Sequence, residues 1–360
     1  MSTTTVESPS VAPASLPAVR PSLKLVGLHI RGLKSIRALD LPEDGLGWQG
    51  KVPDVMLVGG INGCGKTTLL NFLSDALELL FNPHDRRAIN SISAKEAVIE
   101  FDIQSDEIPP TRISFLVGDD AFIQEHRTNN SWWLAIQGGH ASLPSGRTMA
   151  IFKSPSWADV ITRLKIPSVL YIPSGERTLV IPPETYKAAG KITEANKFVY
   201  RWSPPRNWKD SPEAMLYSLR WADLNAKEEG RPADATHFAP YAEAFRQFTG
   251  GEKELIWKNG ELVIRITKTG ATHDLSELSS GEKQVLLLTG ELLRHWRPGS
   301  LILIDEPELH LHPRWQDQFY LALCHWQKER GGQVILATHS RQFVHLAGSG
   351  TGVLLGMEPL

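Results

Sequence analysis

The sequence has few cysteines, no long apolar run and no excess of one charge. Only Cys64 and Cys324 occur among 360 residues, so no disulfide framework is expected and a reducing cytoplasm fits best. No apolar run reaches the roughly 18 to 20 residues that a membrane helix needs, and no secretion signal opens the chain. The formal net charge of -2 gives no overall bias toward nucleic acid or acidic membranes. We therefore expect a cytoplasmic protein without a membrane segment.

Composition divides the chain into four stretches. Residues 1–21 are rich in Ser, Thr, Pro and Ala, which predicts a disordered tail. Short apolar runs are typical of buried parallel strands and occur at residues 55–58, 169–172, 301–304 and 334–337. Alternating runs and an Asn-Gly turn predict antiparallel strands as well. The predicted class is α/β, with a mostly parallel core sheet and an antiparallel β subdomain. We expect these sheets in residues 22–177 and 251–360, and an inserted helical or irregular lobe at 178–250.

A phosphate-binding motif stands between a predicted strand and a helix predicted over residues 66–80. Residues 60–67 read Gly-Ile-Asn-Gly-Cys-Gly-Lys-Thr and match G-x-x-x-x-G-K-[ST]. Glycines let backbone N–H groups converge on phosphate oxygens, Lys66 adds a positive charge, and the Thr67 hydroxyl is a ligand for Mg²⁺. A redox role for Cys64 is disfavoured because the motif is variable at that position. The residues predicted to bind ATP here are Asn62, Gly63, Cys64, Gly65, Lys66, Thr67 and Thr68.

Two carboxylates end the apolar run at residues 301–304. A buried strand would deliver Asp305 beside the phosphates, where it can hold Mg²⁺ together with Thr67. Glu306, the next residue, can accept a proton from an attacking water. We therefore predict Thr67 and Asp305 as metal-binding residues and Glu306 as the catalytic base of an ATPase.

Residues 278–284, Leu-Ser-Ser-Gly-Glu-Lys-Gln, resemble the signature of ABC ATPases, which precedes the acidic strand at this distance. Thr338-His339 resembles the switch histidine of the same family. The resemblance implies an ABC-type P-loop NTPase fold and a homodimer whose subunits meet head to head through the ATP sites. It also implies a catalytic role for His339, and contacts to the opposite subunit's nucleotide from Ser280, Gly281 and Glu282.

Two further stretches resemble a particular branch of that superfamily. Residues 305–313, Asp-Glu-Pro-Glu-Leu-His-Leu-His-Pro, and residues 28–36 are similar to segments of the AAA15/AAA21 ATPases, relatives of the RecF and OLD proteins and of the Rad50/SMC heads. The resemblance implies that residues 22–177 and 251–360 are the two ATPase lobes. Zinc binding by His310 and His312 is disfavoured because no third ligand is evident.

The chain departs from the family at one point. A glutamine loop should follow a core strand, but residues 169–172 continue as Pro-Ser-Gly-Glu-Arg. Ser174 or Glu176 could take the place of the glutamine at Mg²⁺ or water, and Arg177 could reach phosphate. Gln104, after another predicted strand, is a weaker candidate.

The predicted insert is locally basic and aromatic, and two interpretations stay open. Basic groups beside aromatic rings suit nucleic-acid backbones and stacked bases. The same residues could instead form a small core with solvated charges. The basic residues are Arg177, Lys187, Lys191, Lys197, Arg201, Arg206 and Lys209, and the aromatic ones are Tyr186, Phe198, Tyr200, Trp202 and Trp208.

Three functional hypotheses follow. The first is an ATPase that controls a separate effector protein, such as a nuclease or toxin, in phage defence, as the AAA15/AAA21 resemblance implies. It is favoured over a single-chain nuclease because OLD proteins carry their nuclease after the ATPase, and too few residues follow His339 for another domain. The second is an ATP-driven clamp on DNA. The third, a transporter's nucleotide-binding subunit, is disfavoured by residues 305–313 and by the missing glutamine.

Overall fold

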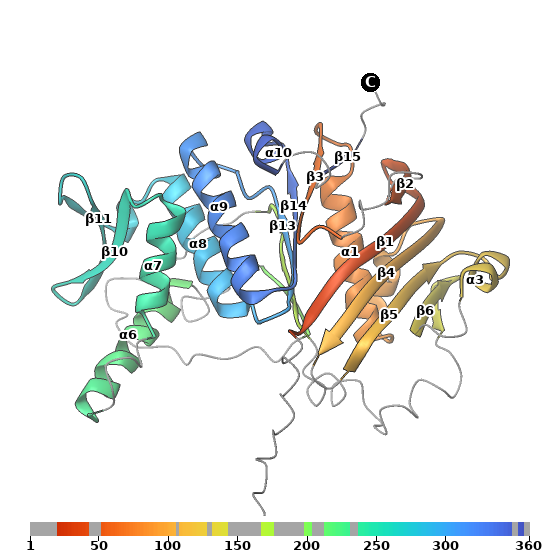
Figure 1. Cartoon of the computed structure of the whole chain (residues 1–360), viewed down its shortest axis with the longest axis horizontal. Helices are drawn as coiled ribbons and strands as arrows, with labels where there is room; N and C mark the ends of the chain where they lie inside the picture. Colours follow the sequence, from red (N-terminus) through yellow and green to blue (C-terminus); the bar gives the residue numbers. More distant parts are fainter. Residues whose placement is uncertain are drawn as a thin grey trace, which may run out of the picture.

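Three β-sheets and the helices between them organise the chain (Figure 1). The computed structural model describes residues 20–42, 52–105, 108–127, 132–142, 167–175, 198–203, 212–230, 237–347 and 352–355. Most of the predicted tail, residues 1–19, lies outside the described residues.

The core sheet has six parallel strands in the order β15-β3-β14-β13-β8-β9. All four apolar runs singled out in the sequence are strands of this sheet, which confirms the predicted α/β class. The sequence did not predict β9, which falls within the stretch expected to be helical or irregular. In chain order the strands are β3 (Val55–Gly60), β8 (Val169–Ile172), β9 (Val199–Arg201), β13 (Leu301–Asp305), β14 (Gln333–Thr338) and β15 (Gly352–Leu355).

A second, mainly antiparallel sheet lies on the other side of helix α1 from the core sheet, at the right of Figure 1. Its order is β2-β1-β4-β5-β6-β7, and only the β5–β6 pair is parallel. This is the predicted antiparallel subdomain. Its strands are β1 (Ser22–Leu33), β2 (Ile36–Leu41), β4 (Glu96–Ser105), β5 (Ile108–Val117), β6 (Trp132–Gln137) and β7 (His140–Ser142).

Side chains alternate across the core sheet and build two hydrophobic cores. On β13, Leu301 and Leu303 face α1 and the antiparallel sheet, whereas Ile302 and Ile304 face the helices on the opposite side. Both faces are therefore buried, as is usual for a parallel sheet. Helices on the antiparallel-sheet side are α1 (Lys66–Phe81), α2 (Arg86–Ser91) and α3 (Asp120–His126).

The opposite face is covered by helices from the second half of the chain, at the left of Figure 1. They are α6 (Pro212–Glu228), α7 (Ala239–Phe248), α8 (Ser280–His295), α9 (Pro313–Arg330) and α10 (Arg341–Ala347). Beyond them stands an antiparallel sheet of β10 (Lys253–Lys258), β11 (Glu261–Ile266) and β12 (Thr272–Asp274), followed by a 3-10 turn, η2 (Leu275–Glu277).

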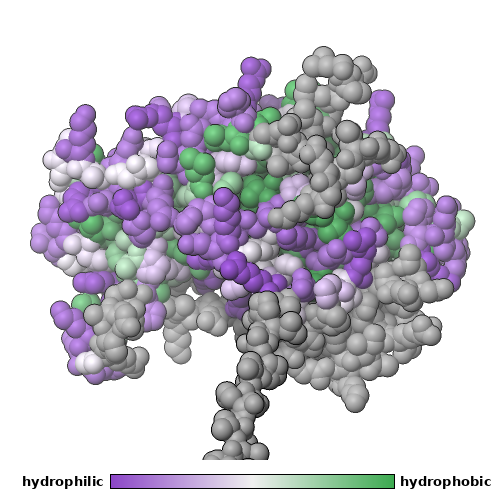
Figure 2. All heavy atoms as spheres, in the orientation of Figure 1, coloured by the Kyte–Doolittle hydropathy of each residue, from purple (hydrophilic) through white to green (hydrophobic). Residues whose placement is uncertain are grey.

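On the face shown in Figure 2, hydrophilic residues predominate at the end formed by β10 and β11, and hydrophobic ones gather toward the middle. Within the described ranges, no helix is long and apolar enough to cross a membrane.

Candidate nucleotide site

The loop between β3 and α1 forms the floor of a cavity of about 460 Å³. Gly65 caps α1 with a φ of 109°, a backbone conformation that a residue with a side chain would adopt only with strain. A Cβ at this position would also lie only 2.6 Å from Ile36 Cγ1. The first turn of α1 therefore presents its N–H groups to the cavity, as a phosphate site requires. The residues that line the cavity are Ser35, Asn62, Gly63, Gly65, Lys66, Thr67, Thr68, Glu306 and His339.

Most residues predicted from the phosphate motif line this cavity, but Cys64 does not. Lys66 is nearly buried, and its Nζ donates to the carbonyls of Gly60 at 3.0 Å and Ile61 at 3.1 Å. The positive charge is thus held inside the loop. Ser35, in the turn between β1 and β2, is a lining residue that the motif did not identify, although the resemblance over residues 28–36 included it.

Oxygen ligands converge beside Thr67. Its Oγ1 donates to Asp305 Oδ2 at 2.7 Å, and Ser174 Oγ donates to the same carboxylate oxygen at 2.8 Å. Two hydroxyls and a carboxylate around one point are the hard oxygen ligands that Mg²⁺ prefers, so this donor set fits the ion implied by the family. Among the described residues no cluster of three His, Cys, Asp or Glu side chains forms a metal site.

Ser174 stands where the family's glutamine was expected, at the end of β8. Of the candidates that the sequence left open, Ser174 contacts Asp305. Gln104 lies in β4, paired with Ser22, and does not line the cavity. The other two candidates, Glu176 and Arg177, lie outside the described residues.

Glu306 and His339 form a pair on the opposite wall of the cavity. Nε2 of His339 lies 3.1 Å from Oε1 of Glu306, and Nδ1 lies 3.3 Å from Lys66 Nζ. Glu306 has a φ of 50°, a strained conformation for a non-glycine residue, and its N–H donates to Ala337 O at 2.7 Å. The strand end is therefore held so that the Glu306 carboxylate faces the cavity.

The turn that carries His339 is fixed by Glu308, to which the sequence assigned no role. Oε1 of Glu308 accepts from Thr338 Oγ1 at 2.8 Å and from the backbone N–H groups of His339 at 2.5 Å and Ser340 at 3.1 Å. One carboxylate oxygen thus orients the whole turn. Farther along the same stretch, His312 caps α9 by accepting from Arg314 N.

The signature residues lie away from this cavity. Ser280 is exposed at the start of α8, and neither it nor Gly281 lines the cavity of its own chain. A Cβ on Gly281 would lie only 2.7 Å from the carbonyl oxygen of His310, so the start of α8 packs directly against the loop after β13.

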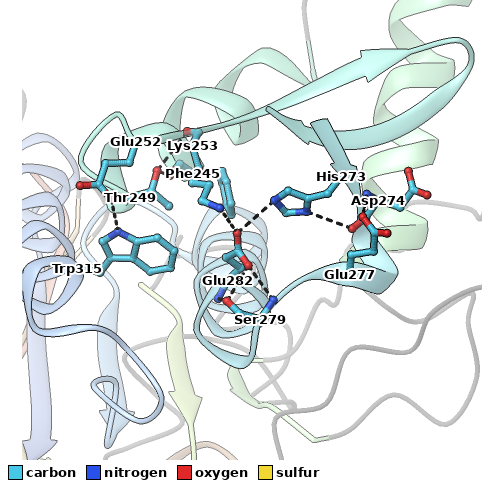
Figure 3. Close-up of polar contacts among 10 residues, drawn as sticks. All are labelled: Phe245, Thr249, Glu252, Lys253, His273, Asp274, Glu277, Ser279, Glu282 and Trp315. Atoms are coloured by element: carbon cyan, nitrogen blue, oxygen red, sulfur yellow. Dashed lines mark hydrogen bonds and ion pairs between the residues drawn. The ribbon is translucent and has the colours of Figure 1, made fainter. Parts of the chain in front are cut away.

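Glu282 is buried, and its carboxylate lies between the start of α8 and the sheet of β10 and β12 (Figure 3). Its Oε2 accepts from Ser279 N at 2.7 Å and from Ser279 Oγ at 2.6 Å, which completes a capping box. Its Oε1 pairs with Lys253 at 2.5 Å and with His273 at 3.5 Å. Burial alone would raise the pKa of Glu282, but the hydrogen bonds from Lys253 and Ser279 outweigh it and hold that pKa below its usual value. Both oxygens are thus engaged within the chain.

Strand β9 connects the phosphate helix to the predicted insert. Arg201 pairs with Asp75 of α1 at 3.1 Å, bonds to Asn71, and lies 4.9 Å from the ring of Tyr171. Burial raises the pKa of Tyr171 far above its usual value, and its hydroxyl donates to Asn71. The sequence did not identify this network, because its members come from three separate elements.

The described aromatic residues of the basic stretch at 177–209 pack inward. Trp202 is 3% exposed, and the ring of Tyr200 stacks on His295 with centroids 3.5 Å apart. Phe198 packs against the core on the α1 side. Trp202 is therefore part of the core, and Arg201 pairs with Asp75 within the chain. The remaining residues of that set lie outside the described ranges: Arg177, Tyr186, Lys187, Lys191, Lys197, Arg206, Trp208 and Lys209.

Residues 164–345 match the model of the family described as "AAA domain, putative AbiEii toxin, Type IV TA system". The chain belongs to this family. The matched residues include the acidic strand β13 and the helix α8. The AAA15/AAA21 resemblance is confirmed.

Relatives match this AAA-family ATPase over short segments. It is 32% identical over 114 residues to the "Retron Ec83 probable ATPase" of Escherichia coli. This match covers 29% of this chain and 21% of the relative. It is 41% identical over 66 residues to "Protein ea59" of Escherichia phage lambda, which is 18% of this chain and 13% of that protein. The matches thus span well under a third of the length of either relative.

Solved SMC heads resemble this AAA-family ATPase along most of its length. An SmcHead bound to the C-winged helix domain of ScpA has a TM-score of 0.47 at 14% identity, with 93% of this chain and 95% of that chain covered. The SMC head domain from Thermotoga maritima has a TM-score of 0.46 at 15% identity, with 93% and 94% covered.

Proposed function

We propose that this chain binds ATP with Mg²⁺ and hydrolyses it as a head-to-head homodimer, and that this cycle controls a separate effector protein. One observation carries the proposal. Lys66, Glu306 and His339 line a single cavity, whereas Ser280, at the start of the signature helix, is exposed outside it. A second copy that presented Ser280 and Gly281 over this cavity would complete the site, because a helix start binds anions.

Each residue has a distinct task in the proposed reaction. The loop N–H groups and Lys66 bind the phosphates, and Thr67, Ser174 and Asp305 would hold Mg²⁺, which neutralises charge on phosphate oxygens. Glu306 accepts the proton of the attacking water at its carboxylate. His339 orients that carboxylate through the 3.1 Å contact between Nε2 and Oε1.

Control of an effector protein is the second part of the proposal. Its support is the family description, which names a toxin of a toxin–antitoxin system, together with the similarity to a retron ATPase. They support an ATPase that acts beside another protein, as the AAA15/AAA21 resemblance implies. Under this proposal, closing and opening of the ATP-bound dimer is the two-state element that the effector senses.

The dimer is tested by mixing two inactive chains. Lys66→Ala removes the phosphate charge, and Ser280→Arg blocks the signature. Each variant alone should hydrolyse little ATP, whereas an equal mixture should recover about a quarter of wild-type activity, because half of the dimers then contain one intact composite site of two. The proposal would be contradicted if the protein hydrolysed ATP at full rate while light scattering showed a monomer. A mixture that stays inactive would contradict it as well.

A further inference from the structure

The corner between α7 and β10 contacts the beginnings of both α8 and α9 (Figure 3). Lys253, the first residue of β10, pairs with Glu282 of α8 at 2.5 Å. The preceding residue, Glu252, accepts from the indole Nε1 of Trp315 in α9 at 3.2 Å. Two adjacent residues of one corner thus hold the starts of two helices.

This corner is itself rigidly held. Thr249 is completely buried, and its hydroxyl lies 3.0 Å from Phe245 O, 3.2 Å from Arg246 O and 3.2 Å from Lys253 O. The end of α7 and the beginning of β10 are therefore tied together, so Lys253 cannot shift without moving the helix behind it.

Both contacts converge on Gly281. Glu282 is its neighbour in the chain, and the Trp315 ring comes within 3.7 Å of where a Gly281 Cβ would stand. The Lys253–Glu282 pair is largely buried, with side chains 18% and 6% exposed, so it is weakly screened by solvent. Lys253 and Glu252 thus contact Glu282 and Trp315, the two residues that adjoin Gly281 at the start of α8.

We propose that Glu252 and Lys253 are positioning residues for the signature: through Trp315 and Glu282 they hold Ser280 and Gly281 in place for the nucleotide bound by the partner chain. Glu282 acts in this clamp and not as a nucleotide ligand. The inference rests on the proposed head-to-head dimer. A misplacement of about 1 Å at such a site costs up to about 100-fold in rate.

The test places Lys253→Met in one chain or the other of the mixed dimer. The Lys66→Ala chain donates the only working signature, and the Ser280→Arg chain holds the only working phosphate loop. In the signature-donating chain, Lys253→Met should lower kcat of the mixture by about 10-fold or more while KM for ATP changes little. In the nucleotide-holding chain, whose signature is already blocked, the same substitution should leave the activity of the mixture unchanged.

Two variants serve as controls. Arg265→Met breaks the exposed pair between Arg265 and Glu254 on the same sheet and should have no effect in either chain. Lys253→Arg keeps the positive charge, so in the signature-donating chain it should retain most of the activity that Lys253→Met loses. Lys253→Met leaves the buried Glu282 carboxylate without its partner, which destabilises the fold. The double variant Lys253→Met, Glu282→Gln removes both charges and is used for the same comparison.

The outcomes separate the two proposals. An equal loss in both positions would show that Lys253 only supports folding, and no loss in the signature-donating chain would show that it does not position the signature; either result overturns this inference while the dimer stands. A mixture that is inactive even with Lys253 in place would overturn the composite site, and this inference with it.

Discussion

Oγ1 of Thr67 lies 2.7 Å from Oδ2 of Asp305, although 238 positions separate the two residues in the chain. The contact joins the phosphate loop of the first half of the chain to the acidic strand of the second. Ser174 Oγ reaches the same carboxylate oxygen from a third strand. The start of α1 and the ends of β8 and β13 thus deliver one set of oxygen ligands.

Asp305→Asn should raise the Mg²⁺ concentration needed for hydrolysis, by about 10- to 100-fold, because it removes the only charged member of this set. Ser174→Ala should have a smaller effect, since a hydroxyl contributes no charge. ATP hydrolysis titrated with Mg²⁺ measures both. Equal Mg²⁺ requirements for Asp305→Asn and the unmodified chain would rule out this metal site.

Glu306→Gln should retain ATP and lose turnover by about 100-fold or more, because the amide cannot accept a proton from water. The side chain keeps its shape and can still approach His339. Steady-state hydrolysis and equilibrium binding of ATP, measured on the same preparation, separate the two effects. An unchanged rate would show that Glu306 is not the base.

Gly281→Ala should abolish most ATP hydrolysis while the chain's own phosphate loop still binds nucleotide. The added Cβ would stand 2.7 Å from the His310 carbonyl oxygen, so backbone must move and the start of α8 would be displaced. Binding is measured by titration with a fluorescent ATP analogue and turnover by phosphate release. Wild-type turnover in this variant would contradict a role for the helix start.

Glu291 and His295, one turn apart on α8, are both held uncharged by burial. Burial raises the pKa of Glu291 from 4.5 to about 7, and contacts from Arg294 and Tyr200 offset only part of that shift. Burial also lowers the pKa of His295 from 6.5 to about 3. Their 3.5 Å contact is therefore a neutral one near pH 6 and not an ion pair.

Glu291→Gln should therefore change how the free energy of unfolding depends on pH. The contribution of Glu291 is complete below its unfolded pKa of 4.5 and is lost as pH rises through about 7. The stability of the variant relative to the unmodified chain should rise by roughly 3 kcal/mol from pH 4 to pH 8. His295 contributes in the opposite direction in both proteins and cancels in the difference. Urea unfolding across this range measures it, and a difference independent of pH would be contrary to the assignment.

Trp202→Ala should destabilise the fold by about 3 to 5 kcal/mol, because a large buried side chain would leave a cavity. Trp221→Ala is the matched control: that side chain is 58% exposed on α6, so its loss should change stability by less than about 0.5 kcal/mol. Thermal or urea unfolding compares them. Similar stabilities of the two variants would show that Trp202 is not part of the core.

The sequence alone determined the features that depend on neighbouring residues. The glycine spacing of residues 60–67 and the apolar run before Asp305 predicted a phosphate loop and an acidic strand, and the structure contains both. Short apolar runs predicted four of the strands of the core sheet. These predictions succeed because strand formation, helix capping and glycine conformations are set largely within a few residues.

Only the tertiary structure decided which distant side chains meet. Strand β9, the inward direction of Trp202 and the contact of Ser174 with Asp305 all depend on which strand pairs with which. The same holds for the contact between Glu282 of α8 and Lys253 of β10. Such contacts form between residues far apart in the chain, so they follow from the packing of the sheets and helices, which no local pattern records.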